Sequence, residues 1–146
     1  MTESQALPPP EDAAAPSGEV YDWYRRGLEL LDSRNPAAAA QLLEHAVAAE
    51  PGSRSLREAL ARAHYDAGNH ARAREVFSEL AAADPADDYA LFGVGLASVR
   101  LGDLATAVEH LALAAAMRPE LGHYQTALVN ARARAAEAAK PPGSTA

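Results

Sequence analysis

A period of 34 residues runs through the middle of the chain. The similar segments AVAAEP, LAAADP and LAAAMRP end at Pro51, Pro85 and Pro119, one period apart. A repeat of this length is a small supersecondary unit that cannot bury its apolar side alone, so neighbouring copies must stack to build a continuous core. Three copies in phase therefore restrict the fold to a stacked repeat structure.

Each copy carries the signals of two helices joined by a tight turn. A short polar residue precedes a helix-favouring run at the same place in every copy, where its side chain suits an N-cap. These residues are Asn35, Asn69 and Asp103. Gly68 and Gly102 stand directly before two of them and suit the positive φ that ends a helix, whereas Arg34 takes that place in the first copy. Ser53 and Asp87 are predicted to cap the helices that follow the prolines.

Residue size also alternates with the repeat. Small residues recur where two helices must approach closely, and these are Gly27, Ala61, Gly95, Ala39, Ala73 and Ala107. Larger residues fill the space between them, and these are Leu43, Phe77 and Leu111. The chain contains 37 Ala, which favours helix strongly and adds little core volume. Both features predict closely packed helices.

Composition and charge exclude several classes of protein. The chain has no Cys, which removes disulfides, thiolate catalysis and Cys-based zinc sites and favours a cytoplasmic location. The N-terminus has neither the basic nor the apolar region of a secretory signal, and no segment is apolar enough to span a bilayer. A net charge of −7 argues against nucleic-acid and membrane partners. The Ala and Arg bias suggests a GC-rich bacterial genome.

These residues resemble the tetratricopeptide repeat family, whose pattern is Trp, Leu, Gly and Tyr followed by Ala, Phe, Ala and Pro. The first copy follows it at Trp23, Gly27, Ala39, Leu43, Ala46 and Pro51. The second follows it at Leu60, Ala61, Ala73, Phe77 and Pro85, and the third at Gly95, Ala107, Ala114 and Pro119. The resemblance implies an all-α, right-handed helical solenoid of three helix-turn-helix repeats with a capping helix.

The expected domain organisation follows from these boundaries. The repeat domain covers 19–139, with repeats at about 20–53, 54–87 and 88–121 and a capping helix at about 121–139. A solenoid needs such a polar-backed terminal element to cover its last open side. Residues 1–18 and 140–146 are rich in Pro, Ala, Gly and Ser and are expected to be disordered tails.

A peptide groove is the predicted functional site. In the family that the chain resembles, the first helices of the pairs line the concave face, and here they carry aromatic, apolar and arginine residues. The predicted peptide-binding residues are Tyr21, Tyr24, Leu28, Glu58, Arg62, Tyr65, Tyr89, Phe92, Leu96, Arg100, Asn130 and Arg134. Arg62, Arg100 or Arg134 would meet an acidic group or a free carboxylate of the ligand. Some family members clamp chaperone C-termini with Lys and Asn, but the matching positions here are Tyr24 and Leu28.

The N-terminal segment LPPP, residues 7–10, allows three interpretations. It is a plain flexible tail, a polyproline ligand for a partner, or a segment that folds back into the protein's own groove. The composition favours the flexible tail.

The sequence carries no recognisable catalytic, cofactor or metal site. The five His include no pair at i, i+4 with an adjacent Glu, and GVG at 93–95 lies within a helix rather than in a phosphate loop. The predicted function is therefore a non-enzymatic adaptor, scaffold or chaperone-like module that binds another protein or peptide. The alternatives are a self-assembling homodimer or an accessory subunit of an enzyme or secretion complex.

Overall fold

The computed structural model describes residues 6–9 and 18–143, and within these the chain forms seven α-helices and no strand. The helices are α1 (Gly18–Asp32), α2 (Pro36–Ala49), α3 (Arg54–Asp66), α4 (His70–Ala83), α5 (Asp88–Arg100), α6 (Leu104–Met117) and α7 (Gly122–Ala138). The predicted all-α repeat fold is confirmed. No helix in the described ranges combines the length and the apolar character needed to cross a bilayer.

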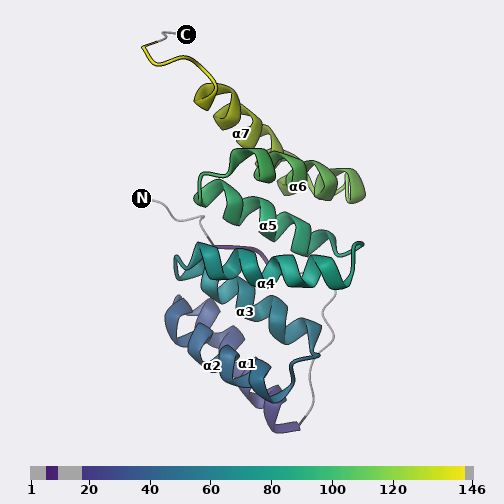
Figure 1. Cartoon of the computed structure of the whole chain (residues 1–146). Helices are drawn as coiled ribbons and strands as arrows, with labels where there is room; N and C mark the ends of the chain where they lie inside the picture. The colour runs from purple at the N-terminus through teal and green to yellow at the C-terminus, as the bar shows by residue number, and fades with distance from the viewer. Residues whose placement is uncertain (1–5, 10–17, 144–146) are drawn as a thin grey trace.

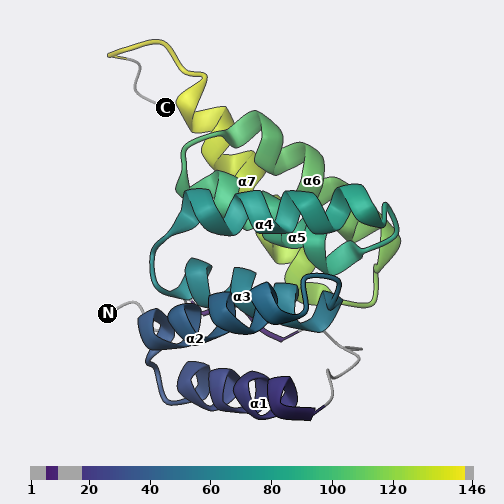
Figure 2. The same ribbon diagram turned by 60° about the horizontal axis from the view of Figure 1, so that its bottom comes forward.

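The helices stack in chain order from α1 to α7, as Figure 1 shows. Each helix packs against the next, and Figure 2 shows α1 with α2 and α3 with α4 as successive pairs. The first helices of the pairs also contact one another, α1 with α3 and α3 with α5, and α5 then contacts α7. These four helices therefore share one side of the stack, and α7 extends it past the last pair.

The turns within the pairs all use a residue with positive φ. Arg34, Gly68 and Gly102 have φ of 64°, 89° and 82°. In each turn the following amide donates to a carbonyl five residues back, as Asn69 does to His64 at 2.8 Å, which satisfies a helix-terminal acceptor. The left-handed conformation costs Arg34 on the order of 1 kcal/mol more than it costs a glycine.

The predicted N-caps are right in position, but not all of them cap through the side chain. Ser53, Asp87 and Asp103 accept hydrogen bonds from amides of the first turn, at 3.3, 3.0 and 3.3 Å. Asn35 and Asn69 make no such bond. The side-chain amide of Asn35 instead lies within hydrogen-bond distance of the carbonyl and hydroxyl of Ser33, and that of Asn69 lies 3.2 Å from Nδ1 of His64 at the end of α3. The N-cap prediction therefore located these helix starts correctly but assigned the wrong side-chain chemistry to both Asn residues.

The small residues lie where the sequence predicts close approach. A Cβ added to Gly27 would lie 2.8 Å from Leu43, and one added to Gly95 would lie 2.5 Å from Leu111. Gly93 is equally tight, because its Cβ would meet three atoms of the Phe77 ring at 2.5 Å. Because these glycines have no side chain, the helices can approach closely both within a pair and between neighbouring pairs.

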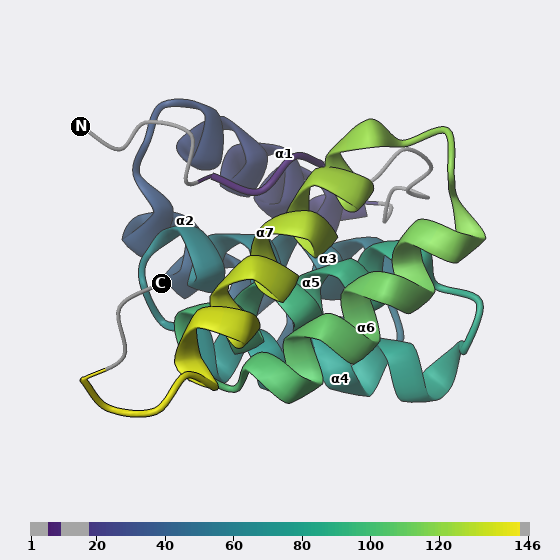
Figure 3. The same ribbon diagram turned by 90° about the horizontal axis from the view of Figure 1, so that it is seen from above.

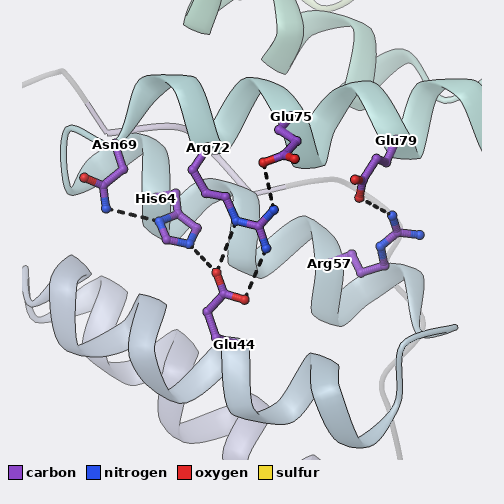
Figure 4. Close-up of polar contacts among 7 residues, drawn as sticks. All are labelled: Glu44, Arg57, His64, Asn69, Arg72, Glu75 and Glu79. Carbon is purple, nitrogen blue, oxygen red and sulfur yellow. Dashed lines mark hydrogen bonds and ion pairs between the residues drawn. The ribbon is translucent and has the colours of Figure 1, made fainter.

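A polar network joins the first two pairs at the junction of α2, α3 and α4 (Figure 4). The side-chain amide of Asn69 lies 3.2 Å from Nδ1 of His64, and Nε2 of His64 donates to Glu44 at 2.8 Å. Arg72 holds the same carboxylate through Nε at 3.3 Å and Nη2 at 3.2 Å. Burial opposes ionisation of Glu44, but these bonds outweigh it and lower its pKa.

We expect Gly93→Ala to destabilise the fold by about 1–3 kcal/mol, because the new methyl group overpacks the buried Phe77 ring. Gly52→Ala is the matched control, since a Cβ there meets nothing within 4 Å and its φ is not positive. Urea denaturation of both variants measures the difference. Equal stability of the two variants would show that the stack does not depend on this approach.

Candidate peptide-binding face

Residues 6–9 lie across the face formed by the first helices of the pairs, as the view along the stack in Figure 3 shows. The backbone amide of Leu7 donates to Oδ1 of Asp66 on α3 at 3.0 Å. The hydroxyl of Tyr89 on α5 donates to the carbonyl of Pro8 at 2.7 Å. Leu7, Pro8 and Pro9 of the LPPP segment therefore fold back onto this face, whereas Pro10 and the rest of the expected N-terminal tail, residues 1–5 and 10–17, lie outside the described residues.

The Leu7 side chain anchors this segment. Only 3% of the residue is exposed, which places it among the core residues of the protein. Burying a leucine side chain stabilises the bound segment by about 1.5–3 kcal/mol, before the cost of ordering the chain. The amide of Leu7 also reduces the effect of burial on Asp66, whose pKa is nevertheless raised.

A cavity of about 620 Å³ adjoins Ala6 and Leu7, where α1 and α3 end. Its charged and titratable lining residues are Asp32, Arg34, Arg62, Asp66, His70 and Arg100. Burial and the nearby Arg100 lower the pKa of His70, which favours the neutral ring at neutral pH. Three arginines then face two aspartates, so the cavity favours an anion.

Arg62 is the most unusual residue in this lining. It is 8% exposed, and its Nε has no hydrogen-bond partner. Among residues 6–9 and 18–143, it forms no ion pair, and neither do Arg34 and Arg100. Asp66 is near enough for the charge of Arg62 to oppose the burial that raises the pKa of that carboxyl. Because the two groups form no direct ion pair, the buried guanidinium still gains from an acceptor that enters the cavity.

Aromatic residues form the wall next to these arginines. The Tyr65 ring lies edge-on to His70 at 5.1 Å between centroids, and the Arg100 guanidinium lies 5.8 Å from the Tyr65 centroid. Burial raises the pKa of Tyr89 well above its ordinary value. Tyr89 therefore keeps its proton and remains a hydrogen-bond donor at neutral pH.

The structure brings only part of the predicted site together. Arg62, Tyr65 and Arg100 line the cavity, and Tyr89 holds Pro8. Tyr21 is exposed on α1, while Tyr24, Leu28 and Leu96 are half-buried. Asn130 and Arg134 are exposed on α7 and do not line the cavity.

Phe92 packs against the capping helix instead of facing open space. Its ring stacks on Tyr124 at 4.4 Å between centroids and meets His123 edge-on at 5.4 Å. Only 3% of the residue is exposed. In this structure the Phe92 ring therefore holds α5 against α7.

The predicted site does not include four charged or titratable residues of the cavity, which are Asp32, Arg34, Asp66 and His70. Leu7 is covered only by the fold-back interpretation of residues 7–10, and the apolar residue before the prolines is its signal. Asp66 and His70 flank the turn between α3 and α4, and nothing in the repeat pattern distinguishes them. The repeat pattern marks Arg34 only by its backbone conformation.

Glu58 is buried beside a second carboxylate. It is 1% exposed, and its Oε2 accepts from Arg54 at 3.1 Å, while its Oε1 has no partner. Asp87 lies 3.5 Å from the same Arg54 nitrogen. Burial is the main cause that raises the pKa of Glu58, and the charge of Asp87 adds to it.

Comparison with known proteins agrees with this architecture. The family model described as tetratricopeptide repeat matches residues 24–88 and again 58–122. The chain belongs to the tetratricopeptide repeat family. No curated protein matches this tetratricopeptide repeat chain at a significant level.

Solved tetratricopeptide repeat structures are similar to it in fold. The Sgt2 TPR domain from Aspergillus fumigatus is 21% identical over 90% of this chain and 91% of that one, with a TM-score of 0.78. The first TPR of Spaghetti (RPAP3), solved with the HSP90 peptide SRMEEVD, is 16% identical over 84% of this chain and 97% of that one, with a TM-score of 0.76. MamA 41-end from Desulfovibrio magneticus RS-1 is 21% identical over 80% of this chain, with a TM-score of 0.75. This chain spans 66% of that MamA chain and 65% of a MamA RS-1 double mutant.

We expect Glu58→Gln to change how stability depends on pH. The folded pKa of Glu58 is raised above 4.5, so its favourable contribution is complete below pH 4.5 and is lost as pH rises through the folded pKa. Glutamine cannot ionise. The free energy of unfolding of Glu58→Gln relative to wild type should therefore increase between pH 4.5 and 7, by at most about 1.4 kcal/mol per pH unit.

Urea denaturation at three pH values measures this difference. Glu109→Gln on the exposed surface of α6 is the matched control for the loss of one carboxylate away from this buried cluster. A Glu58→Gln difference that falls as pH rises would contradict the raised pKa.

Proposed function

We propose that this protein is an interaction module that binds a peptide segment of another protein on the face formed by α1, α3, α5 and α7. An acidic group of that segment would enter the cavity beside Leu7. The observation that carries the proposal is the buried guanidinium of Arg62, which has no ion-pair partner among the described residues and lines that cavity.

The chemistry of the cavity supports a carboxylate as the bound group. A guanidinium offers a planar fork of donors that matches a carboxylate, and charge-assisted bonds of this kind are about twice as strong as neutral ones. Two structural neighbours were solved with acidic peptides, the HSP90 peptide SRMEEVD and the HSP70 peptide SGPTIEEVD. Some family members bind a chaperone C-terminus with Lys and Asn at the positions of Tyr24 and Leu28. In this chain the cations lie elsewhere, at Arg34, Arg62 and Arg100, so the proposal names a carboxylate and not a chaperone.

The adaptor or chaperone-like role follows from this site. The face holds residues 6–9 through main-chain bonds and one apolar anchor, and its arginines are available to an acidic group of a partner. Such a surface is suited to capture of a partner without changing it chemically. We therefore propose that the protein delivers, stores or scaffolds its partner in the cytoplasm, without an enzymatic activity of its own.

Affinity capture from the native cell tests the proposal. We expect Arg62→Gln to reduce recovery of the specific partner at least tenfold, because a charge-assisted hydrogen bond contributes about 1.5–3 kcal/mol. Quantitative mass spectrometry of the recovered proteins measures the loss, and Glu109→Gln on α6 is the matched control. Circular dichroism melting confirms that each variant is folded.

Arg100→Gln provides a second test at an exposed position, where a folding defect is not expected. It should weaken capture in the same direction, and high salt should weaken capture by wild type. Undiminished capture by folded Arg62→Gln and Arg100→Gln proteins would remove the cavity from the function.

A further inference from the structure

We propose that the peptide this face binds is an extended segment in which a leucine-like residue is followed directly by proline, and that residues 6–9 are an intramolecular copy of it. The proposal rests on the proposed function and specifies its ligand. It is carried by Leu7 and Pro8, which the face holds through one buried side chain and two main-chain hydrogen bonds.

The two hydrogen bonds define what the backbone of a ligand must offer. Asp66 accepts from the amide of Leu7, so the residue at this position must have an N–H and cannot be proline. Tyr89 donates to the carbonyl of the next residue, which proline supplies as well as any other. These two hydrogen bonds, which we call the main-chain clamp, set both the direction and the register of an extended segment.

Proline after the leucine suits such a surface for two reasons. It has no N–H, so laying Pro8 and Pro9 along the face leaves no donor unpaired. Its fixed φ also holds the chain in an extended conformation before binding, which lowers the entropy lost on binding. A ligand with the same pattern gains the same advantages.

The side-chain requirement comes from the site of Leu7. The residue is almost fully buried and belongs to the same apolar cluster as Leu31 and Tyr65. A smaller or an uncharged polar residue here would lose the apolar contacts that Leu7 makes with this cluster. Specificity therefore comes from one apolar anchor between two main-chain contacts.

The covalent link makes the chain's own segment a competitor of the partner. Residues 10–17 join Pro9 to α1, and a link of this length holds a segment at an effective concentration of about 1 mM. If the segment binds with a dissociation constant of about 0.1 mM, it weakens an external ligand roughly tenfold. Removing the anchor should open the face to an external copy.

Binding of a fluorescein-labelled peptide with the sequence of residues 1–12, MTESQALPPPED, tests the proposal. The full-length protein with Leu7→Ser loses the apolar anchor and gains no charge beside Arg62. It should bind this peptide roughly tenfold more tightly than wild type in fluorescence anisotropy, because its own segment no longer competes. A control peptide with Ser in place of its leucine should bind neither protein. Adding Tyr89→Phe to Leu7→Ser removes the hydroxyl that donates to the peptide backbone and should weaken binding of the peptide again.

Equal affinity of wild type and Leu7→Ser for the peptide would overturn the proposal, as would equal binding of the control peptide. A dimer that dissociates on Leu7→Ser would overturn the intramolecular arrangement, because the segment would then occupy a second copy. The proposed function has its own test, which is capture of the partner. If the peptide does not bind but capture of the partner still depends on Arg62, this inference is wrong and the proposed function stands.

Discussion

The stack depends on the close approach of a residue without a side chain to a large residue of a neighbouring helix. Gly27 meets Leu43 and Gly95 meets Leu111 within a pair, while Gly93 meets Phe77 between pairs. Gly27 and Gly95 hold the same place in the first and third pairs, and the fully buried Ala61 holds it in the second. Because a small residue stands at this place in every pair, the pairs adopt a similar geometry. The first helices of successive pairs consequently face the same side and form one continuous surface, which is long enough to receive an extended peptide.

The features that follow from this recurrence could be predicted from the sequence. Turn positions, helix starts and close contacts depend on local propensity and on residues that repeat in phase, so three copies give the same information three times. Arg34 shows the strength of the constraint. It adopts φ of 64° where the other two turns have glycine, because the packing of both flanking helices determines the turn.

Features that occur once could not be predicted in this way. The position of residues 6–9 depends on Asp66 and Tyr89, which lie far along the chain and carry no repeat signature. Phe92 has the spacing of a groove residue, but Tyr124 of the capping helix covers its ring. Whether such a side chain is covered or exposed depends on a residue from another part of the chain. The repeat pattern contains no information about that residue.

The arginines around the cavity differ from the other arginines of the stack in their ion pairing. Arg72 and Arg74 on α4 have acidic partners, whereas Arg34, Arg62 and Arg100 around the cavity have none among the described residues. Residues 6–9 contain no charged side chain, so the seated segment satisfies the apolar anchor and the main-chain clamp but does not neutralise the arginines. A partner that combines the same leucine and proline with a carboxylate gains an interaction that Ala6–Pro9 does not make. The face can thus be covered by its own chain and still prefer an external ligand.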